Sequence, residues 1–172
     1  AFKSSISPPD SRVSQLPQIV LVFGGSLGAD PYTSSRQLFL NWMLAKNHPI
    51  SSLIRTPEQF SDWSQYEGYG NLIDFESDAG NLSRAVVLFS EGPGAFAELG
   101  AFCMDPVLSE RLFVVIEKRH YKDTSFIAHG PIKKIEHQNE DAICVVNSIL
   151  PQDIEAELPD IADVLAAKMK SA

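Results

Sequence analysis

Glu98 is the residue of this sequence that points most directly to chemistry, because a turn rich in glycine and proline comes just before it. The turn spans residues 90–94, and the residues after it predict a helix over about 95–104. Because Glu98 lies one helical turn beyond Gly94, we expect it in the first turn, where the helix N-terminus stabilises an ionised carboxylate. Such a carboxylate is able to attack or stabilise an oxocarbenium-like anomeric carbon. A capping or solvent-facing glutamate would show the same spacing.

Two glycine-rich loops each follow an apolar run that is typical of a buried strand. The first opens with Gly24-Gly25-Ser26, and the second is the turn at 90–94. Ligands of an open parallel sheet bind outside the carboxyl ends of its strands, so we expect both loops to converge on one ligand. Glycines let the backbone pass close to that ligand, and the helix after the second loop aims its amide groups at it. The expected substrate-binding residues in the loops are Gly24, Gly25, Ser26, Ser90, Pro93 and Gly94.

Further candidate residues lie outside the glycine-rich loops, on two of the predicted helices. Asp74 and Asp78 are four residues apart and share one face of a predicted helix, whereas Glu76 lies on another face. A solvated acidic face is the simplest interpretation, and the candidate exceptions are Glu76 for catalysis and Asp74 for substrate binding. Arg36 follows the first loop, where it is able to bind a phosphate, pair with a carboxylate or face solvent.

Several other classes of chemistry are disfavoured. The loop at 24–28 lacks both the complete dinucleotide-binding fingerprint and the Lys-Ser/Thr ending of a P-loop, which argues against hydride transfer and NTP hydrolysis. No metal-ligand spacing connects the histidines, which are His48, His120, His129 and His137. Cys103 and Cys144 lie in apolar surroundings, so we expect reduced core thiols. We predict neither a metal nor a cofactor.

Strands and helices are predicted to alternate along the chain. Apolar runs predict strands at 19–23, 50–54, 85–89, 111–117 and 142–146, and helical spacing predicts helices at 34–46, 71–83 and 95–104. This order implies βαβ units. The predicted fold class is therefore α/β, a Rossmann-like three-layer sandwich with a mostly parallel five-stranded sheet. The irregular stretch at 56–70 is rich in aromatic and acidic residues and is predicted to be lid-like.

The bulk properties fit one domain, since the chain has 172 residues, of which 44% are hydrophobic. We expect a flexible N-terminal segment at 1–17, the domain at 18–150 and a C-terminal helical tail at 151–172, interrupted or restarted at Pro159. The formal charge of −8 argues against autonomous binding of nucleic acid. No signal-peptide pattern or membrane-spanning run is present in the sequence, so a cytoplasmic location and no membrane partner are expected.

Several stretches over about residues 18–147 carry a family resemblance. Gly24-Gly25 ends a strand, Phe75-Glu76 precedes a later strand, and residues 91–102 follow the pattern Glu-Ser-Pro-Gly-Ser-x-x-Glu-Leu-Gly-Ala-Phe. The likeness continues through 111–116, 125–127 and 130–132. The sequence thereby resembles the nucleoside 2-deoxyribosyltransferase-like proteins, and most closely the N-glycosidase effector (toxin) subunits of bacterial retron anti-phage systems.

The resemblance implies a catalytic glutamate at Glu98 and cleavage of an N-glycosidic bond, with NAD or a nucleoside as substrate rather than cofactor. It also implies a homo-oligomer and, in the defence setting, control by a reverse transcriptase with its RNA–DNA product. Gly92 and Ala95 replace serines of the family pattern, so hydroxyl contacts would come from Ser26 or Ser90. The winged-helix region that follows in related effectors has no counterpart within these 172 residues.

Two alternatives to N-glycosidic cleavage stay open. Related Rossmann-like domains with a Pro-Gly loop and a following glutamate bind signalling nucleotides without cleaving them, which would make the chain a non-catalytic nucleotide sensor. A phosphoribohydrolase resembling cytokinin-activating enzymes is the other alternative, whose loop is Pro-Gly-Gly-x-Gly-Thr-x-x-Glu. The chain matches that loop at Pro93-Gly94 and Glu98 but lacks its second glycine and its threonine.

Overall fold

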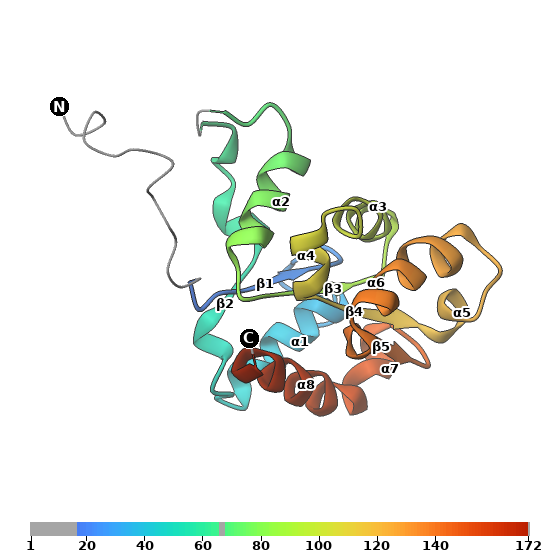
Figure 1. The fold of residues 1–172 in the computed structure, drawn as a ribbon. Coiled ribbons are helices and arrows are strands. Elements are labelled where there is room, and N and C mark those ends of the chain that lie inside the picture. The colour runs from blue at the N-terminus through green and yellow to red at the C-terminus, as the bar shows by residue number, and fades with distance from the viewer. Residues whose placement is uncertain (1–16, 66–67, 172) are drawn as a thin grey trace.

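A parallel β-sheet forms the centre of the molecule (Figure 1). The computed structural model describes residues 17–65 and 68–171, and within them five strands pair in the order β2-β1-β3-β4-β5. The strands are β1 Val20–Phe23, β2 Ile54–Arg55, β3 Ala85–Phe89, β4 Leu112–Glu117 and β5 Ile143–Val146. Every pair in this sheet is parallel. The predicted α/β Rossmann-like sandwich is confirmed, whereas most of the segment 1–17, predicted to be flexible, lies outside the described residues.

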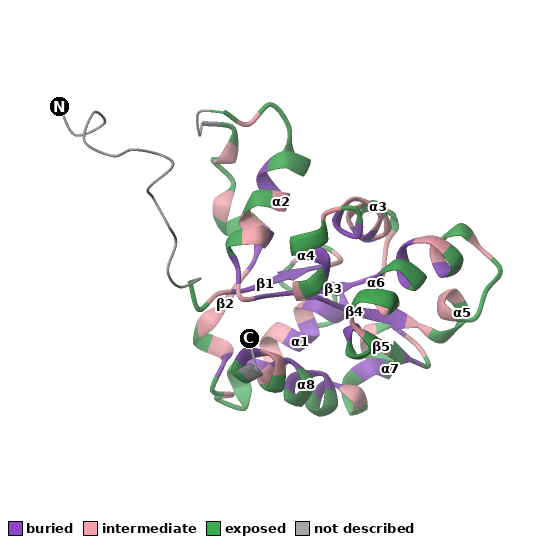
Figure 2. Cartoon of the chain, in the orientation of Figure 1, coloured by how far each residue is buried: buried purple, intermediate pink, exposed green. Residues whose placement is uncertain are grey.

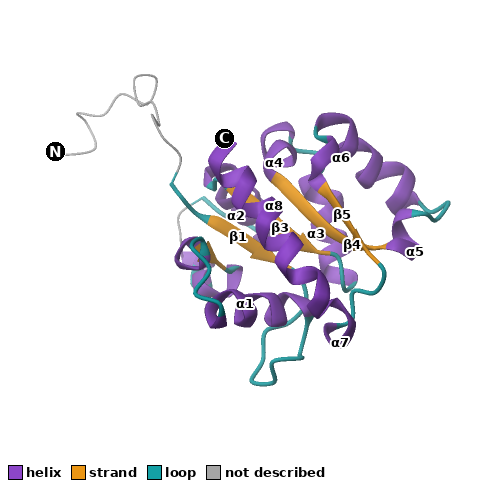
Figure 3. Ribbon diagram, turned by 90° about the horizontal axis from the view of Figure 1, so that it is seen from below, coloured by secondary structure: helices purple, strands orange, loops and turns teal. Residues whose placement is uncertain are grey.

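Helices cover both faces of the sheet (Figures 1 and 3). The α-helices are α1 Ser35–Ala45, α2 Leu72–Leu82, α3 Pro93–Phe102, α4 Pro106–Arg111, α5 Lys118–Tyr121, α6 Lys133–Gln138, α7 Pro151–Ile154 and α8 Leu158–Ser171. A π-helical turn, Ala128–Ile132, leads into α6, and short 3-10 turns occur at Ser51–Leu53, Pro57–Phe60, Trp63–Gln65, Glu140–Ala142 and Glu155–Glu157. Helices α1, α7 and α8 lie on one face, and α2, α3, α4 and α6 lie on the other.

The apolar runs form central strands because both of their faces are covered, as Figure 2 shows. Alternate side chains of β1 enter different cores. Val20 and Val22 pack on the side of α1 and α8, whereas Leu21 and Phe23 pack on the side of α3 and α4. Every residue of β1 and β3 is buried. The two buried layers therefore fix the sheet rigidly beneath the loops at its carboxyl edge.

The C-terminal segment predicted as a tail contributes to the first of these cores. Leu158, Ile161 and Leu165 of α8 are fully buried against the face of the sheet that α1 also covers. The predicted break at Pro159 lies within one residue of the observed restart, because α8 begins at Leu158 after the 3-10 turn Glu155–Glu157. Proline is well tolerated in the first turn of a helix.

Two predicted boundaries are wrong in ways that matter for the site. The strand predicted at 50–54 is mostly a 3-10 turn, and β2 has only the residues Ile54–Arg55 at the edge of the sheet. The helix predicted at 95–104 begins at Pro93 and ends at Phe102. Proline favours the first helical position, because its fixed φ suits the helix and the amide hydrogen that it lacks would have no helical partner.

Within residues 17–65 and 68–171, no helix combines the length and the apolar character needed to cross a membrane.

Candidate active site

The site lies where the chain connections of the sheet change direction. From β1 the chain passes through α1 to β2 on one side, and from β3 it passes through α3 and α4 to β4 on the other side. Because β1 and β3 are neighbours, with Phe23 paired to Leu88, the loops after them lie side by side. Such a switch point is the usual ligand crevice of an open α/β sheet. The convergence of the two glycine-rich loops is therefore confirmed.

Glu91 connects these two loops. Its Oε1 accepts hydrogen bonds from the backbone N–H of Gly25 at 2.8 Å and of Arg36 at 3.1 Å, and its Oε2 accepts one from Ser35 at 2.7 Å. Two of these donors lie at the N-terminus of α1, where a carboxylate is favoured by the helix dipole. The sequence interpretation gave Glu91 no role. Glu91 comes just after the end of the strand predicted at 85–89. That position is the sequence signal that its side chain is able to contact the loop after the neighbouring strand.

The Gly24-Gly25 pair serves this contact. Gly24 has φ of +147°, which L side chains rarely adopt. A Cβ at Gly25 would lie 2.8 Å from Cδ of Glu91 and 2.8 Å from Cβ of Ser34. The pair is thus explained by the close approach of the loops. A direct contact between either glycine and a ligand, as expected from the sequence, stays a prediction.

Arg36 is the central cation of the site. It is only 2% exposed, and its guanidinium donates to the carbonyl of Val22 at 3.3 Å and to both carboxylate oxygens of Glu58, at 2.5 and 3.3 Å. This is the carboxylate pairing foreseen for Arg36, and the surface alternative is wrong. Glu58, which the sequence interpretation missed, belongs to the irregular stretch at 56–70. Burial raises the pKa of Glu58, but hydrogen bonds from Arg36 and the backbone outweigh it, so the net pKa is lowered.

Glu98 is half-buried on α3. The prediction that the N-terminus of this helix stabilises its ionised carboxylate is wrong. Because α3 begins at Pro93, Glu98 lies in the second turn, beyond the region where a helix N-terminus stabilises an anion. Burial raises the pKa of Glu98, the charge of Arg36 lowers it, and Glu58 raises it again, with a net rise. Its Oε2 is buried without a hydrogen-bond partner among the described residues. This carboxylate is therefore short of partners.

Glu76 lies at the same site from α2. It is 7% exposed, and burial together with the negative charges of Glu98 and Glu58 raises its pKa to about 7, against the opposing effect of Arg36. The two other acidic residues of α2 are exposed, unlike Glu76. Asp74 is exposed and exchanges hydrogen bonds with Asn71, and the exposed Asp78 accepts one from Tyr69 at 2.9 Å. The predicted separation of faces is confirmed, and Asp74 makes its described contacts at the helix N-terminus, away from the Glu76 face.

The remaining predicted ligand contacts differ in exposure. Ser90 is 1% exposed, and its Oγ is buried without a partner among the described residues, as is Nε of Arg36. Ser26, Pro93 and Gly94 are exposed. A Cβ at Gly94 would have no described heavy atom within 4 Å, so there is open space above the start of α3. Buried polar groups normally have partners, so those of Arg36, Ser90 and Glu98 fit a site that a polar ligand completes.

Metal-binding side chains and thiols add nothing to this site. Across the described part of the chain, no cluster of three or more histidine, cysteine or acidic residues is arranged to hold a metal ion. Both cysteines are free, as predicted. Cys103 is a core residue, whereas Cys144 is only half-buried. Burial raises the pKa of both thiols, that of Cys144 to about 11, which keeps them unreactive.

Fold and site together define an α/β protein with flavodoxin-like strand order and a cluster of carboxylates at the switch point of the sheet. The chain belongs to the STM3845 retron effector protein family, whose model matches residues 32–172. That match includes Arg36, Glu76 and Glu98, and it confirms the resemblance to retron effectors. The wider resemblance to nucleoside 2-deoxyribosyltransferase-like proteins stays a prediction.

Two curated proteins of Escherichia coli are similar to part of the chain. The "Retron Ec73 putative ribosyltransferase/DNA-binding protein" is 31% identical over 86 residues, which is 50% of this chain and 27% of that protein. The "Retron Ec86 putative ribosyltransferase/DNA-binding protein" is 30% identical over 105 residues, which is 60% of this chain and 34% of that protein. The matched part of the chain thus spans about a third or less of the length of these relatives.

Proposed function

We propose that the chain is the glycosyl-cleaving part of a retron defence effector, an N-glycosidase that acts on a nucleoside or nucleotide such as NAD. The observation that carries the proposal is the electrostatically coupled pair of Glu76 and Glu98 beside Arg36 at the switch point. Enzymes that cleave glycosidic bonds usually use two carboxyl groups, one protonated and one ionised. The names of the two relatives, which include ribosyltransferase, support the same class of reaction.

The surroundings of the two carboxylates favour different roles. At Glu98 the largest charge effect is the lowering of the pKa by Arg36, whereas at Glu76 it is the raising of the pKa by Glu98. When one proton is shared, Glu76 therefore holds it and Glu98 is ionised. Glu98 is then the nucleophile or electrostatic partner of C1′, and Glu76 is the general acid.

The reaction balances with these two residues and water. The bond between C1′ and the base nitrogen breaks, Glu98 stabilises or bonds to C1′, and Glu76 gives its proton to a base that cannot leave as an anion. Water then adds to C1′, and its proton returns to a carboxylate. Nicotinamide leaves NAD as a neutral molecule, so cleavage of NAD depends on Glu98 and much less on Glu76.

The unpartnered polar atoms supply contacts for the sugar. Ser90 Oγ and Arg36 Nε are buried at the same edge of the sheet as Glu98. Both are able to bond hydroxyl groups of a ribose. Gly92 gives the start of α3 no side-chain cap, so the backbone N–H groups of Gly94 and Ala95 are suited to a phosphate in the open space over Gly94. Membership of the retron effector family supports control of this activity by a reverse transcriptase and its RNA–DNA product.

The test is turnover by the purified protein with NAD and a panel of nucleosides, followed by separation of free bases. Glu98→Gln should reduce kcat by about 10³-fold or more, because it keeps the shape and removes the charge. The matched control is Glu155→Gln, since Glu155 is exposed on a turn before α8. Equal activity of the Glu98 variant would overturn the proposal. Thermal stabilisation by an intact nucleotide without any product would instead support the nucleotide sensor.

A further inference from the structure

The buried cation of the carboxylate site is paired with an exposed acid. The side chain of Arg36 is 3% exposed, whereas that of its partner Glu58 is 50% exposed. Glu98 is more deeply buried, yet its Oε2 has no hydrogen-bond partner among the described residues. A buried carboxylate gains more from a neighbouring cation than an exposed one does, because water screens it less. The choice of Glu58 as partner therefore needs an explanation other than the stability of the ion pair.

A short turn of defined geometry holds Glu58 in this position. Glu58 belongs to the 3-10 turn Pro57–Phe60, which begins with a capping box at the buried Thr56. The ring of Phe60 packs against that of Phe75 of α2, with 6.2 Å between the ring centroids. The turn is thus fixed at its start by hydrogen bonds and at its end by an aromatic contact. The pairing with Arg36 therefore depends on folded backbone and not only on a flexible side chain.

Glu58 occupies both terminal nitrogens of the Arg36 guanidinium. Nη2 donates to Oε1 of Glu58 at 2.5 Å and Nη1 donates to Oε2 at 3.3 Å, and Nη1 also donates to the carbonyl of Val22. A guanidinium binds a carboxylate most strongly through two parallel N–H donors. The terminal pair of donors is already used by Glu58. Arg36 therefore acts on Glu98 and Glu76 through its charge.

The charges around Glu76 come from three other elements, and they are Glu98 of α3, Glu58 of the turn and Arg36 of α1. The other acids of α2, Asp74 and Asp78, are exposed. Glu58 raises the pKa of Glu76 and that of Glu98 by its negative charge. It also binds the cation that lowers both pKa values. Glu58 thus favours a retained proton at the site in two ways.

We propose that Glu58 is a positioning residue of the N-glycosidic site, which holds the terminal nitrogens of Arg36 away from Glu98 and Glu76. This inference rests on the proposed function. Without Glu58, Arg36 is free to form an ion pair with one of the two buried carboxylates. Such a pair would occupy the carboxylate that must meet C1′, or it would take the proton from the general acid. The exposed partner of Arg36 therefore keeps both catalytic groups available.

The first experiment follows the carboxyl groups of Glu76 and Glu98 by carbon-13 NMR during a pH titration of the purified protein without substrate. Glu58→Gln removes the charge and keeps the length of the side chain, so both pKa values should fall. Unchanged titrations in the folded Glu58 variant would overturn the proposal.

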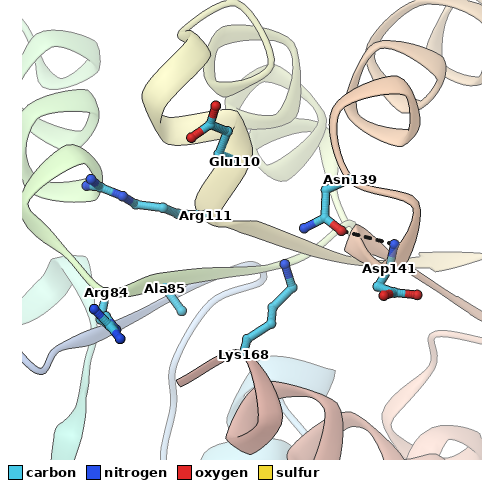
Figure 4. Close-up of a pocket in the computed structure, with 7 residues that line it drawn as sticks. All are labelled: Arg84, Ala85, Glu110, Arg111, Asn139, Asp141 and Lys168. Carbon is cyan, nitrogen blue, oxygen red and sulfur yellow. Dashed lines mark hydrogen bonds between the residues drawn. The ribbon is translucent and has the colours of Figure 1, made fainter. Parts of the chain in front are cut away.

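Glu110→Gln is the matched control for this titration. Glu110 is exposed and lines a cavity of about 220 Å³ at the opposite, amino edge of the sheet, where β3 and β4 begin (Figure 4). Its removal takes away one negative charge, as Glu58→Gln does, but far from Arg36. Both titrations should therefore stay as in the unmodified protein.

A double-mutant cycle separates an action through Arg36 from a direct effect of the Glu58 charge. In an Arg36→Gln background, Glu58→Gln should lower the two pKa values much less than it does in the unmodified protein. An equal fall in both backgrounds would overturn the positioning role. If Arg36→Gln does not fold, Glu58→Asp decides, because it keeps the charge but is one methylene too short to hold both terminal nitrogens. The pKa values should then still fall, and unchanged values would refute the proposal.

The pH dependence of turnover is the readout that belongs to the proposed reaction. For nucleosides whose base must be protonated, Glu58→Gln should move the decline of kcat to lower pH, because less of Glu76 is protonated. At pH 7 the rate should fall by about fivefold, and Glu110→Gln should not change it. An unmoved profile in the Glu58 variant would count against the proposal. Absence of turnover by the unmodified protein would refute the proposed function alone, since the titrations and the double-mutant cycle need no substrate.

Discussion

The two edges of the sheet differ in how charged side chains are arranged. At the carboxyl edge, acidic side chains gather around the buried Arg36, and they are Glu58, Glu76, Glu91 and Glu98. At the amino edge, cations and carboxylates together line a cavity, and they are Arg84, Arg111, Lys168, Glu110 and Asp141. Burial beside other carboxylates raises the pKa of Glu76 and Glu98, which equips them for acid–base chemistry, whereas the acids of the amino edge are exposed and lie near cations. The comparison therefore favours the carboxyl edge as the place for acid–base chemistry.

The largest effect on the cleavage rate is expected from removing the proton donor of the carboxyl edge. Glu76→Gln should reduce cleavage of nucleosides whose base must be protonated by about 10²- to 10⁴-fold, and cleavage of NAD much less. Because the pKa of Glu76 is raised to about 7, the rate with such nucleosides should fall as pH rises above that value. The measurement is kcat against pH for both substrate types. Asp78→Asn, on the exposed side of α2, is the control, and an equal loss with NAD would refute the assignment of Glu76 as acid.

The next largest effect concerns the contact between the two glycine-rich loops at the carboxyl edge. Gly25→Ala should cost about 1–3 kcal/mol of unfolding free energy, because the added Cβ overpacks the loop contact. It should also lower kcat by about 100-fold through displaced catalytic groups. The clash is expected with Glu91, whose Cδ would lie 2.8 Å away. Urea unfolding and turnover measure the two quantities. Gly70→Ala is the control, because its Cβ would have no described atom within 4 Å. If both variants behave alike, the loop contact is not required.

A third effect concerns the dependence of folding stability on pH. The folded-state pKa of Glu76 is raised from 4.5 to about 7, so the folded state binds more protons than the unfolded state between these values. Stability is therefore lost as pH rises through this window. The gain in unfolding free energy from Glu76→Gln should be about 3 kcal/mol larger at pH 8 than at pH 4. Urea unfolding at both pH values measures this, and a constant difference would contradict the burial of an uncompensated charge.

The sequence predicted the sheet well because its central strands carry their own signal. The runs at 19–23, 85–89 and 112–116 are apolar on both faces, which few other structures require. The edge strand β2 has no such constraint, and its apolar neighbour Ile50 helps to close the core from outside the strand. Strand prediction therefore failed at the short edge strand β2, but it succeeded at the other edge strand, β5, whose residues Ile143–Val146 are an apolar run.

The site was predicted less completely because its main contacts join distant parts of the chain. Glu98 and Glu76 were found from turn chemistry and helical faces, which are local features. Glu91 contacts Gly25 across 66 positions, and Glu58 pairs with Arg36 from an irregular segment. The rise in the pKa of Glu98 also depends on burial that only the packed helices create. Charge states depend on tertiary neighbours, so the local reasoning reversed the direction for Glu98.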